Sequence, residues 1–228
     1  MYNDINYLYL KDHAVFQGLT KDQLYDILGH VKFARKRKSE LIRISENEQP
    51  ILYFLIKGKV KVTEIDEMGN SLIKGVEREG DIFGNFARTS IQNYEFAQTL
   101  TNEVVFFYIS LADFESLSKS MPLLALNLSD YIGRKLKNVQ TRYNHLVFKD
   151  VKTRLVSFFM SWADSEGHHD GNKITIKNYL THSDIAEIIS TCRQTVTSIL
   201  NDLKSDGYID YSRREIVISD MDALERAA

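Results

Sequence analysis

The sequence predicts an α+β protein built from three successive parts. These are an antiparallel β-roll (a double-stranded β-helix) with flanking helices, a long dimerisation helix and a winged helix-turn-helix. Short apolar segments with turn signals fill residues 31–109, a seven-residue apolar repeat follows in residues 123–148, and two helical patterns joined by a tight turn occupy residues 181–203. We place the three parts at residues 1–120, 121–148 and 149–228.

The composition is that of an ordinary globular protein. Of the 228 residues, 43% are hydrophobic and 26% are charged, which is enough for two separate cores. The single cysteine, Cys192, excludes a disulfide within the chain, and the N-terminal segment lacks the apolar run of a signal peptide, so we expect a cytoplasmic protein. No stretch approaches the ~20 apolar residues that span a bilayer. The net charge of −2 argues against broad, non-specific nucleic-acid binding.

The first part begins with a helical pattern over residues 1 to about 30, in which Thr20 and Gln23 suit a capping box. From Val31 to Ile109 the pattern becomes strand-like, with segments such as LIRIS and EVVFFYIS that are rich in β-branched and aromatic residues. Glycines at turn positions separate these segments. Such short, evenly punctuated strands predict a small antiparallel barrel or roll.

The second part is a long helix that we expect to begin near Pro122 and to run to Phe148. A seven-residue apolar repeat with charged neighbours is typical of the seam between two helices, so this helix predicts a homodimer. The alternative is a long helix packed on its own barrel. The seam residues are Ala125, Leu128, Ile132, Val139 and Leu146, with Leu136 and Tyr143 flanking them.

The third part opens with a helix over residues 150–162, a polar loop SEGHHDGN and a short strand within KITIKNYL. In the next stretch, Ile185 and Ile189 fall on one face of a first helix, and Val196 and Leu200 fall on one face of a second. The residues between the two helices break the pattern. Two short β segments then bracket residues 212–214, which is the arrangement of a hairpin wing.

The outward positions of the second helix carry short or forked hydrogen-bonding side chains. In a major groove, Arg pairs with guanine, Gln with adenine, and Thr or Ser with phosphates or bases. The wing would bring two arginines to a phosphate backbone. An ordinary helical hairpin with a solvated face fits the same pattern. The candidate DNA-contacting residues are Arg193, Gln194, Thr195, Thr197, Ser198, Arg213 and Arg214.

The charge of the third part favours a rival interpretation. Residues 149–228 contain ten Lys and Arg against thirteen Asp and Glu, a net charge of −3, whereas DNA-binding domains usually show a basic footprint. The rival is a small-molecule-binding β-roll module whose C-terminal domain mediates protein contacts. An enzyme is not expected, because no nucleophile–base pair and no phosphate-cradling glycine loop occurs in the sequence.

Two segments resemble the Crp/Fnr family of bacterial transcription regulators. ILYFLIKGKVKVTEIDEMGNSLIKGVEREGDIFGN resembles the family's roll, and LTHSDIAEIISTCRQTVTSILNDLKSDGYI resembles its DNA-binding motif. The resemblance spans about residues 16–218. It implies a homodimeric, sequence-specific transcription regulator that binds a double-stranded DNA operator of two-fold symmetry, with RNA polymerase as a candidate partner.

The resemblance also assigns roles residue by residue. Arg193 matches the family's first recognition residue, and His182 stands where the family often has a phosphate contact. Gln194 replaces the family's Glu and Ser198 replaces an Arg, so the operator should differ from the commonest family consensus.

The segment that would bind an effector departs from the cyclic-AMP-binding members. Those members carry a Glu after the roll's Gly and an Arg-Ser pair farther on, whereas here Asn85 follows Gly84, and Tyr94 and Glu95 stand at the pair. A cyclic phosphate would lose its bidentate cation and meet a carboxylate, so we expect no cyclic-AMP dependence and an effector that is unknown or absent. The candidate pocket residues are Gly84, Asn85, Phe86, Arg88, Tyr94 and Glu95; the aromatic residues here either fill the roll or line a pocket for a less charged molecule.

Metal and redox cofactors are not expected. An iron–sulfur sensor needs several thiolates, and the chain has only Cys192. No histidine lies between Val31 and Asn144, which excludes a histidine-based metal site in the roll. At the start of the second helix and beside Arg193, Cys192 is expected to have a lowered thiol pKa, and its oxidation would block DNA contact. The alternative is a small residue tolerated at a helix cap.

Overall fold

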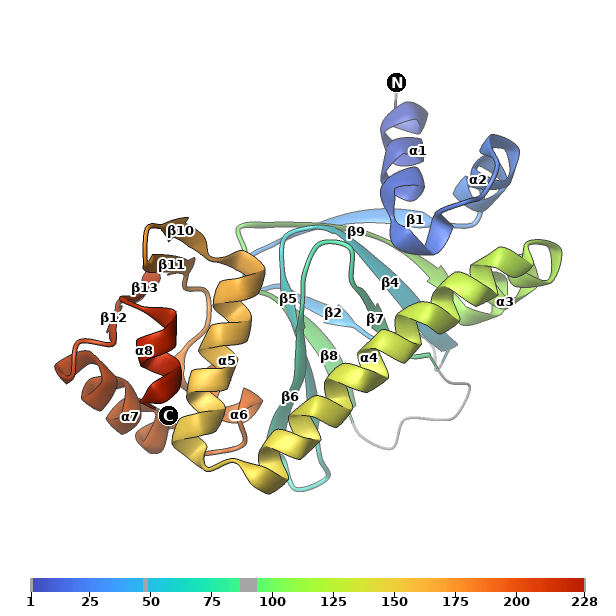
Figure 1. Ribbon diagram of the computed structural model, residues 1–228. Coiled ribbons are helices and arrows are strands. Elements are labelled where there is room, and N and C mark those ends of the chain that lie inside the picture. The colour runs from blue at the N-terminus through green and yellow to red at the C-terminus, as the bar shows by residue number, and fades with distance from the viewer. Residues whose placement is uncertain (1, 47–48, 87–93, 228) are drawn as a thin grey trace. The chain divides into compact units, whose positions relative to one another are not determined.

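A computed structural model describes residues 2–46, 49–86 and 94–227 (Figure 1). The chain forms two compact units, Met1–Asn138 and Val139–Ala228, and each is described by itself below. The long helix α4 (Pro122–Phe148) contributes its first part to unit 1 and its last part to unit 2. None of the described helices combines the length and the apolarity that crossing a membrane requires.

Unit 1 begins with the predicted helical segment. It contains α1 (Tyr2–Asp12), a 3-10 turn (Ala14–Phe16) and α2 (Lys21–Leu28). The predicted capping box is present, because Thr20 N donates to Gln23 Oε1 at 2.9 Å and Gln23 N donates to Thr20 Oγ1 at 3.3 Å. The start of α2 is therefore fixed by local sequence.

Two antiparallel sheets form the roll, which confirms the predicted fold class. One sheet has the strand order β1-β9-β4-β3, with β7 also paired to β4, and the other has the order β2-β8-β5-β6. The strands are β1 (Lys32–Arg37), β2 (Leu41–Arg43), β3 (Ser45–Glu46), β4 (Gln49–Lys57), β5 (Val60–Ile65), β6 (Ser71–Glu77), β7 (Ile82–Gly84), β8 (Tyr94–Thr99) and β9 (Glu103–Ser110).

Strand β4 divides its side chains between two cores. Tyr53 and its alternate neighbours belong to the core between the two sheets, whereas Phe54 belongs to the core beneath the helices. The Tyr53 ring stacks on Phe83 at 4.9 Å between centroids, and the Phe54 ring stacks on Phe107 at 4.8 Å. The two-residue period of a strand thus supplies both faces of the sheet.

Two helices follow the roll, and each begins at a local sequence signal. Helix α3 (Leu111–Ser120) is capped by Ser110, whose Oγ accepts from Asp113 N at 3.0 Å. Helix α4 begins at Pro122, as expected for a proline in a first helical turn.

Unit 2 is a helical domain with a four-stranded sheet of order β10-β11-β13-β12. Helices α5, α6, α7 and α8 all carry buried side chains; α5 contacts β11 and α8, and α7 contacts α6 and β12. The elements are α5 (Val151–Glu166), β10 (His168–Asp170), β11 (Lys173–Lys177), α6 (His182–Ile188), α7 (Arg193–Ser205), β12 (Ile209–Tyr211), β13 (Glu215–Ile218) and α8 (Met221–Arg226).

The prediction of a polar loop at residues 165–172 is wrong. Helix α5 continues to Glu166, and β10 pairs antiparallel with β11 across a turn in which Gly171 has φ +58°. All three side chains of β10 are exposed, so the strand carries no apolar alternation from which it could be predicted.

Candidate DNA-binding interface and effector loop

The helix-turn-helix is built by short-range contacts. A capping box of Thr181 and Asp184 starts α6, with Thr181 N donating to Asp184 Oδ2 at 2.8 Å. The turn passes through Ser190, whose φ of +56° ends the helical path. The buried side chains of Ile185 and Val196 then hold α6 and α7 to the core of unit 2.

Arg154, on α5, holds the turn from outside. Its Nε donates to Ile189 O at 3.0 Å, its Nη2 to Ser190 O at 3.3 Å and its Nη1 to Lys149 O at 2.9 Å. These carbonyls belong to the C-terminal ends of helices, where acceptors lack helical partners. Arg154 was not predicted from the sequence, in which nothing distinguishes it from the nearby Lys152.

The structure places the predicted reading residues on the first half of α7. Arg193, Gln194 and Ser198 are exposed. Thr195 and Thr197 are half-buried, and the Thr195 hydroxyl lies 3.1 Å from Cys192 Sγ. The exposed residues are therefore available to a groove, whereas the two threonines already make contacts within unit 2.

His182, Thr197 and Tyr211 bring three elements together. His182 Nδ1 lies 3.0 Å from Thr197 Oγ1, and the His182 and Tyr211 ring centroids are 5.4 Å apart in an edge arrangement. The Tyr211 hydroxyl donates to Asn201 Oδ1 at 2.8 Å. Burial, and then the charge of Arg193, lowers the pKa of His182 below its usual value.

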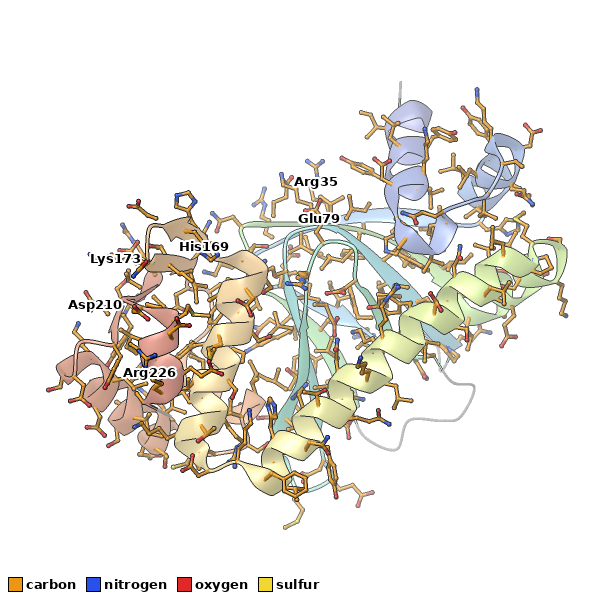
Figure 2. The ribbon with its side chains drawn as sticks, viewed as in Figure 1. Arg35, Glu79, His169, Lys173, Asp210 and Arg226 are labelled. Carbon is orange, nitrogen blue, oxygen red and sulfur yellow. The ribbon has the colours of Figure 1, made fainter. Side chains whose placement is uncertain are left out.

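The wing carries Arg213 and Arg214 in the exposed turn between β12 and β13. The turn is closed by Ser212 N, which donates to Glu215 O at 2.8 Å. At the base of the wing, Lys204 pairs with Asp210 at 2.6 Å (Figure 2 labels Asp210). The wing is thereby tied to α7.

Several of the acidic residues in residues 149–228 serve as helix caps. Asp150 Oδ1 accepts from Thr153 N at 2.8 Å, and Asp220 Oδ1 accepts from Ala223 N at 2.8 Å. Asp184 does the same within the capping box of α6. A carboxylate at a helix N-terminus is compensated by the helix dipole. Part of the net charge of −3 therefore lies on carboxylates that already have structural partners within unit 2.

Cys192 is the exposed N-cap residue of α7. Its thiol pKa is lowered, as expected, but the main cause is the hydrogen bond with the Thr195 hydroxyl.

The candidate effector residues do not form one site in the described part of unit 1. Gly84 ends β7 with φ +120°, and a Cβ there would lie 2.1 Å from Ile51 O, so only glycine fits. Phe86 and Tyr94 are exposed, and Arg88 lies outside the described residues. Asn85 N donates to Ile51 O at 3.1 Å.

Glu95 instead belongs to an ion cluster between three strands. Its carboxylate, on a side chain that is 8% exposed, lies 3.2 Å from Lys74 Nζ, which is also 3.1 Å from Glu64. Burial raises the pKa of Glu95, and Lys74 opposes that rise. Because two carboxylates already face Lys74, this cluster does not offer a free cation to an anionic ligand.

Two side chains of α4, Tyr131 and Lys135, join that helix to the roll. The Tyr131 hydroxyl accepts from Ile82 N at 2.7 Å and donates to Ile82 O at 3.0 Å, and Lys135 pairs with Glu77. Burial, and then the charges of Glu77 and Asp81, raises the pKa of Tyr131. Ile82 opens β7, the strand that leads to Gly84. Neither Tyr131 nor Lys135 was predicted from the sequence to make these contacts.

The predicted seam residues lie on α4, and most are exposed. Ala125, Ile132, Val139 and Leu146 are exposed, whereas Leu128 is half-buried and packs against the core of unit 1. Leu136 and Tyr143, which the sequence placed beside the stripe, are 55% and 66% exposed. The groove between α3 and α4, of about 420 Å³, continues this apolar surface.

Comparisons with known proteins agree with this architecture. Residues 153–227 match the family described as the Crp-like helix-turn-helix domain. The cAMP-activated global transcriptional regulator CRP of Pasteurella multocida is 29% identical over 187 residues, which cover 79% of this chain and 86% of that protein. The transcriptional regulator LdrP of Thermus thermophilus is 29% identical over 201 residues, which cover 86% of this chain and 95% of that protein.

Solved structures extend the agreement to the whole chain. A CRP-family transcriptional regulator from Thermus thermophilus is 26% identical, with a TM-score of 0.67 over 85% of this chain and 95% of that one. A CooA variant from Carboxydothermus hydrogenoformans has a TM-score of 0.74 over 96% of this chain and 97% of that one, at 24% identity, and shows the shared fold. Residues 153–227 therefore match the Crp-like helix-turn-helix family, and the chain as a whole is similar to Crp-family transcription regulators.

Proposed function

We propose that the protein is a homodimeric, sequence-specific transcription regulator that reads a two-fold-symmetric operator with α7. The observation that carries this proposal is the division of α7 into two faces. Val196, Leu200 and Leu203 are buried in unit 2, whereas Arg193 and Gln194 are exposed at the first turn of α7. A recognition helix contacts base edges with its N-terminal residues.

The exposed residues suggest what the operator contains. The guanidinium of Arg193 suits a guanine and the amide of Gln194 suits an adenine. Ser198 offers a single hydroxyl and discriminates less between bases. Arg213 and Arg214, in the wing, would contact phosphates, which position the protein without reading sequence.

The exposed stripe of α4 supports the dimer and defines its register. Successive stripe positions alternate between spacings of four and three residues, which is the spacing of a two-helix coiled coil. In this register Ser129 replaces the half-buried Leu128. The stripe consists of Ala125, Ser129, Ile132, Leu136, Val139, Tyr143 and Leu146.

The roll would sense a signal other than cyclic AMP, or none. One relative is named as cAMP-activated, but this chain lacks the Arg-Ser pair, and Lys74 is already opposed by Glu64 and Glu95. We therefore expect cyclic AMP to leave DNA affinity unchanged. The regulator would act in the cytoplasm, with RNA polymerase as a partner if it activates transcription.

The test of DNA reading is a selection of genomic duplex fragments on the ligand-free protein at moderate salt. We expect a two-fold-symmetric motif. Arg193→Ala combined with Gln194→Ala should weaken binding to that motif by roughly a hundredfold or more, because each base contact contributes about 1–3 kcal/mol. Ser205→Ala, at the other end of α7, is the matched control.

Retention of full affinity in the double variant, or an affinity that ignores salt, would contradict DNA reading. It would favour the rival in which unit 2 binds a protein. If the selection enriches no DNA motif, and adding cell extract does not change this, DNA reading would likewise be contradicted.

The test of the dimer compares two exposed leucines on α4. Leu136, on the stripe, and Leu126, outside it, are 55% and 66% exposed. Leu136→Asp should dissociate the dimer in sedimentation at micromolar concentration, because it would bury a charge at the seam. Leu126→Asp should remain dimeric. Equal behaviour of the two variants would show that the stripe is not the interface.

A further inference from the structure

The hydrogen bonds of Thr197 determine where His182 carries its proton. Thr197 Oγ1 donates to Arg193 O at 2.9 Å and lies 3.0 Å from His182 Nδ1. A hydroxyl has one proton to donate, and a backbone carbonyl can only accept. The remaining contact therefore requires the proton of His182 Nδ1.

This arrangement selects one tautomer of the neutral ring. With Nδ1 protonated, Nε2 of neutral His182 has a lone pair and no proton. A phosphate oxygen also has only lone pairs, so neutral His182 cannot donate to it. Only the imidazolium form presents an Nε2 proton and a positive charge to a DNA backbone.

We propose that His182 binds a DNA phosphate only in its protonated form, so that DNA binding takes up a proton at each half-site. The proposal rests on the proposed DNA-reading function of unit 2 and adds a pH dependence to it. The first helix of a helix-turn-helix crosses the DNA backbone, which is where a residue at the start of α6 would meet a phosphate.

The surroundings of His182 keep the ring neutral in the free protein. The groups that face it are Thr197 and Arg193 from α7 and Tyr211 from the wing; the Lys204–Asp210 pair lies behind Tyr211. Burial and the charge of Arg193 lower its pKa below the usual value. A phosphate would oppose the charge of Arg193 and raise the pKa of His182. Proton uptake should therefore occur between the lowered pKa of His182 in the free protein and its higher pKa in the complex.

The experiment uses a random-sequence DNA duplex of about 30 base pairs, because a phosphate contact does not depend on sequence. Affinity is measured by fluorescence anisotropy from about pH 8 to about pH 6 at constant salt, for the full-length protein. We expect affinity to rise as the pH falls, by at most about tenfold per pH unit for each half-site. Calorimetry in two buffers of different ionisation enthalpy should show proton uptake.

Three variants separate the proton from other effects of acid. His182→Gln should lose most of the pH dependence, and His182→Arg should bind tightly with a flat profile, because its charge is permanent. Thr197→Val removes the hydroxyl that accepts from Nδ1–H, so neutral His182 can carry its proton on Nε2 and donate it to a phosphate. Binding near pH 8 should then be tighter, and the affinity should change less with pH. His169→Gln, on exposed β10 (Figure 2), is the control and should behave like the wild type.

Each remaining outcome overturns the inference. If the wild type and His182→Gln share one pH slope, or if binding releases no buffer-dependent heat, His182 does not bind as a cation. If Thr197→Val leaves the slope unchanged, the hydroxyl does not select the tautomer. If no variant binds either this duplex or the motif recovered by the selection at any pH, the proposed DNA-reading function itself is wrong. Binding without pH dependence leaves that function intact.

Discussion

The DNA-reading unit and the roll are held together over different distances along the chain. In unit 2, Thr181 caps α6 through Asp184, three residues away, and His182 meets Thr197, fifteen residues away. In unit 1, Tyr131 meets Ile82 across 49 residues, and Asn127 Nδ2 donates to Val15 O across 112. A short motif can therefore specify much of the helix-turn-helix, with the contact of Arg154 to Ile189, 35 residues away, as a long-range exception, whereas the roll depends on the whole domain.

The two units also differ in how they accommodate departures from the family pattern. On α7, Gln194 and Ser198 are exposed, so they can replace other residues without disturbing the buried face of the helix. In the roll, the Glu95 side chain is only 8% exposed, and its carboxylate needs Lys74 beside it. A change of operator thus involves single exposed residues, whereas a change of effector requires compensating changes on neighbouring strands.

The largest difference that we expect between the two units is a loss of stability in acid that is confined to unit 1. His13 is 6% exposed, packs against Phe16 and Phe54, and accepts from Val15 N through Nδ1 at 3.3 Å. Burial lowers the pKa of His13 to about 4. The unfolded chain binds the proton more tightly, so stability is complete above about pH 6.5 and falls by about 3 kcal/mol as the pH approaches 4.

Urea unfolding at several pH values would measure this loss. Trp162 is the single tryptophan and lies in unit 2, so its fluorescence follows that unit, while far-UV circular dichroism follows both. His13→Asn keeps an acceptor for Val15 N but does not titrate. The wild type and this variant should differ in the slope of unit 1 stability against pH; identical slopes would contradict the assignment.

A smaller effect should appear in unit 2 alone. Arg154→Ala removes the donors to the carbonyls of Ile189 and Ser190, and we expect a loss of about 2 kcal/mol in the Trp162 unfolding transition. Arg154→Lys should recover only part of this, because an ammonium cannot reproduce the fork of a guanidinium. Lys173→Ala, which removes an exposed cation from β11, is the control and should have little effect.

Local features of the sequence predicted much of the fold. The capping box of Thr20 and Gln23 and the start of α4 at Pro122 both follow from neighbouring residues. The two faces of α7 follow from helical periodicity. These features need no knowledge of the rest of the chain.

The missed features depend on pairing between distant segments. Glu95 reaches Lys74 because β8 and β6 both pair with β5, and an irregularity between Val62 and Thr63 shifts the β5–β6 register. A one-residue shift changes which face of a sheet a side chain occupies, so the sequence alone could not place Lys74. Arg154 and Tyr131 were missed for the same reason, because their partners are backbone groups far along the chain.

The smallest effect tests the link between α4 and the roll. Tyr131→Phe leaves the N–H and carbonyl of Ile82 without their buried partner, and we expect unit 1 to lose about 1 kcal/mol. Tyr143→Phe, on the exposed stripe of the same helix, should have no such effect. The pKa of Tyr131 is raised, so wild-type stability should fall as the pH rises above about 10, where the unfolded phenol ionises and the folded one does not.

Tyr131→Phe should lack the loss of stability above about pH 10, because it has no phenol to ionise. Hydrogen exchange of the peptide that contains Ile82 measures both effects, since this amide is the one that donates to the Tyr131 hydroxyl. Faster exchange in Tyr131→Phe with no change in the Trp162 transition would confine the effect to unit 1. Equal exchange in the two tyrosine variants would show that the hydroxyl does not hold β7, and unit 1 would then depend less on its distant contacts than the comparison with unit 2 implies.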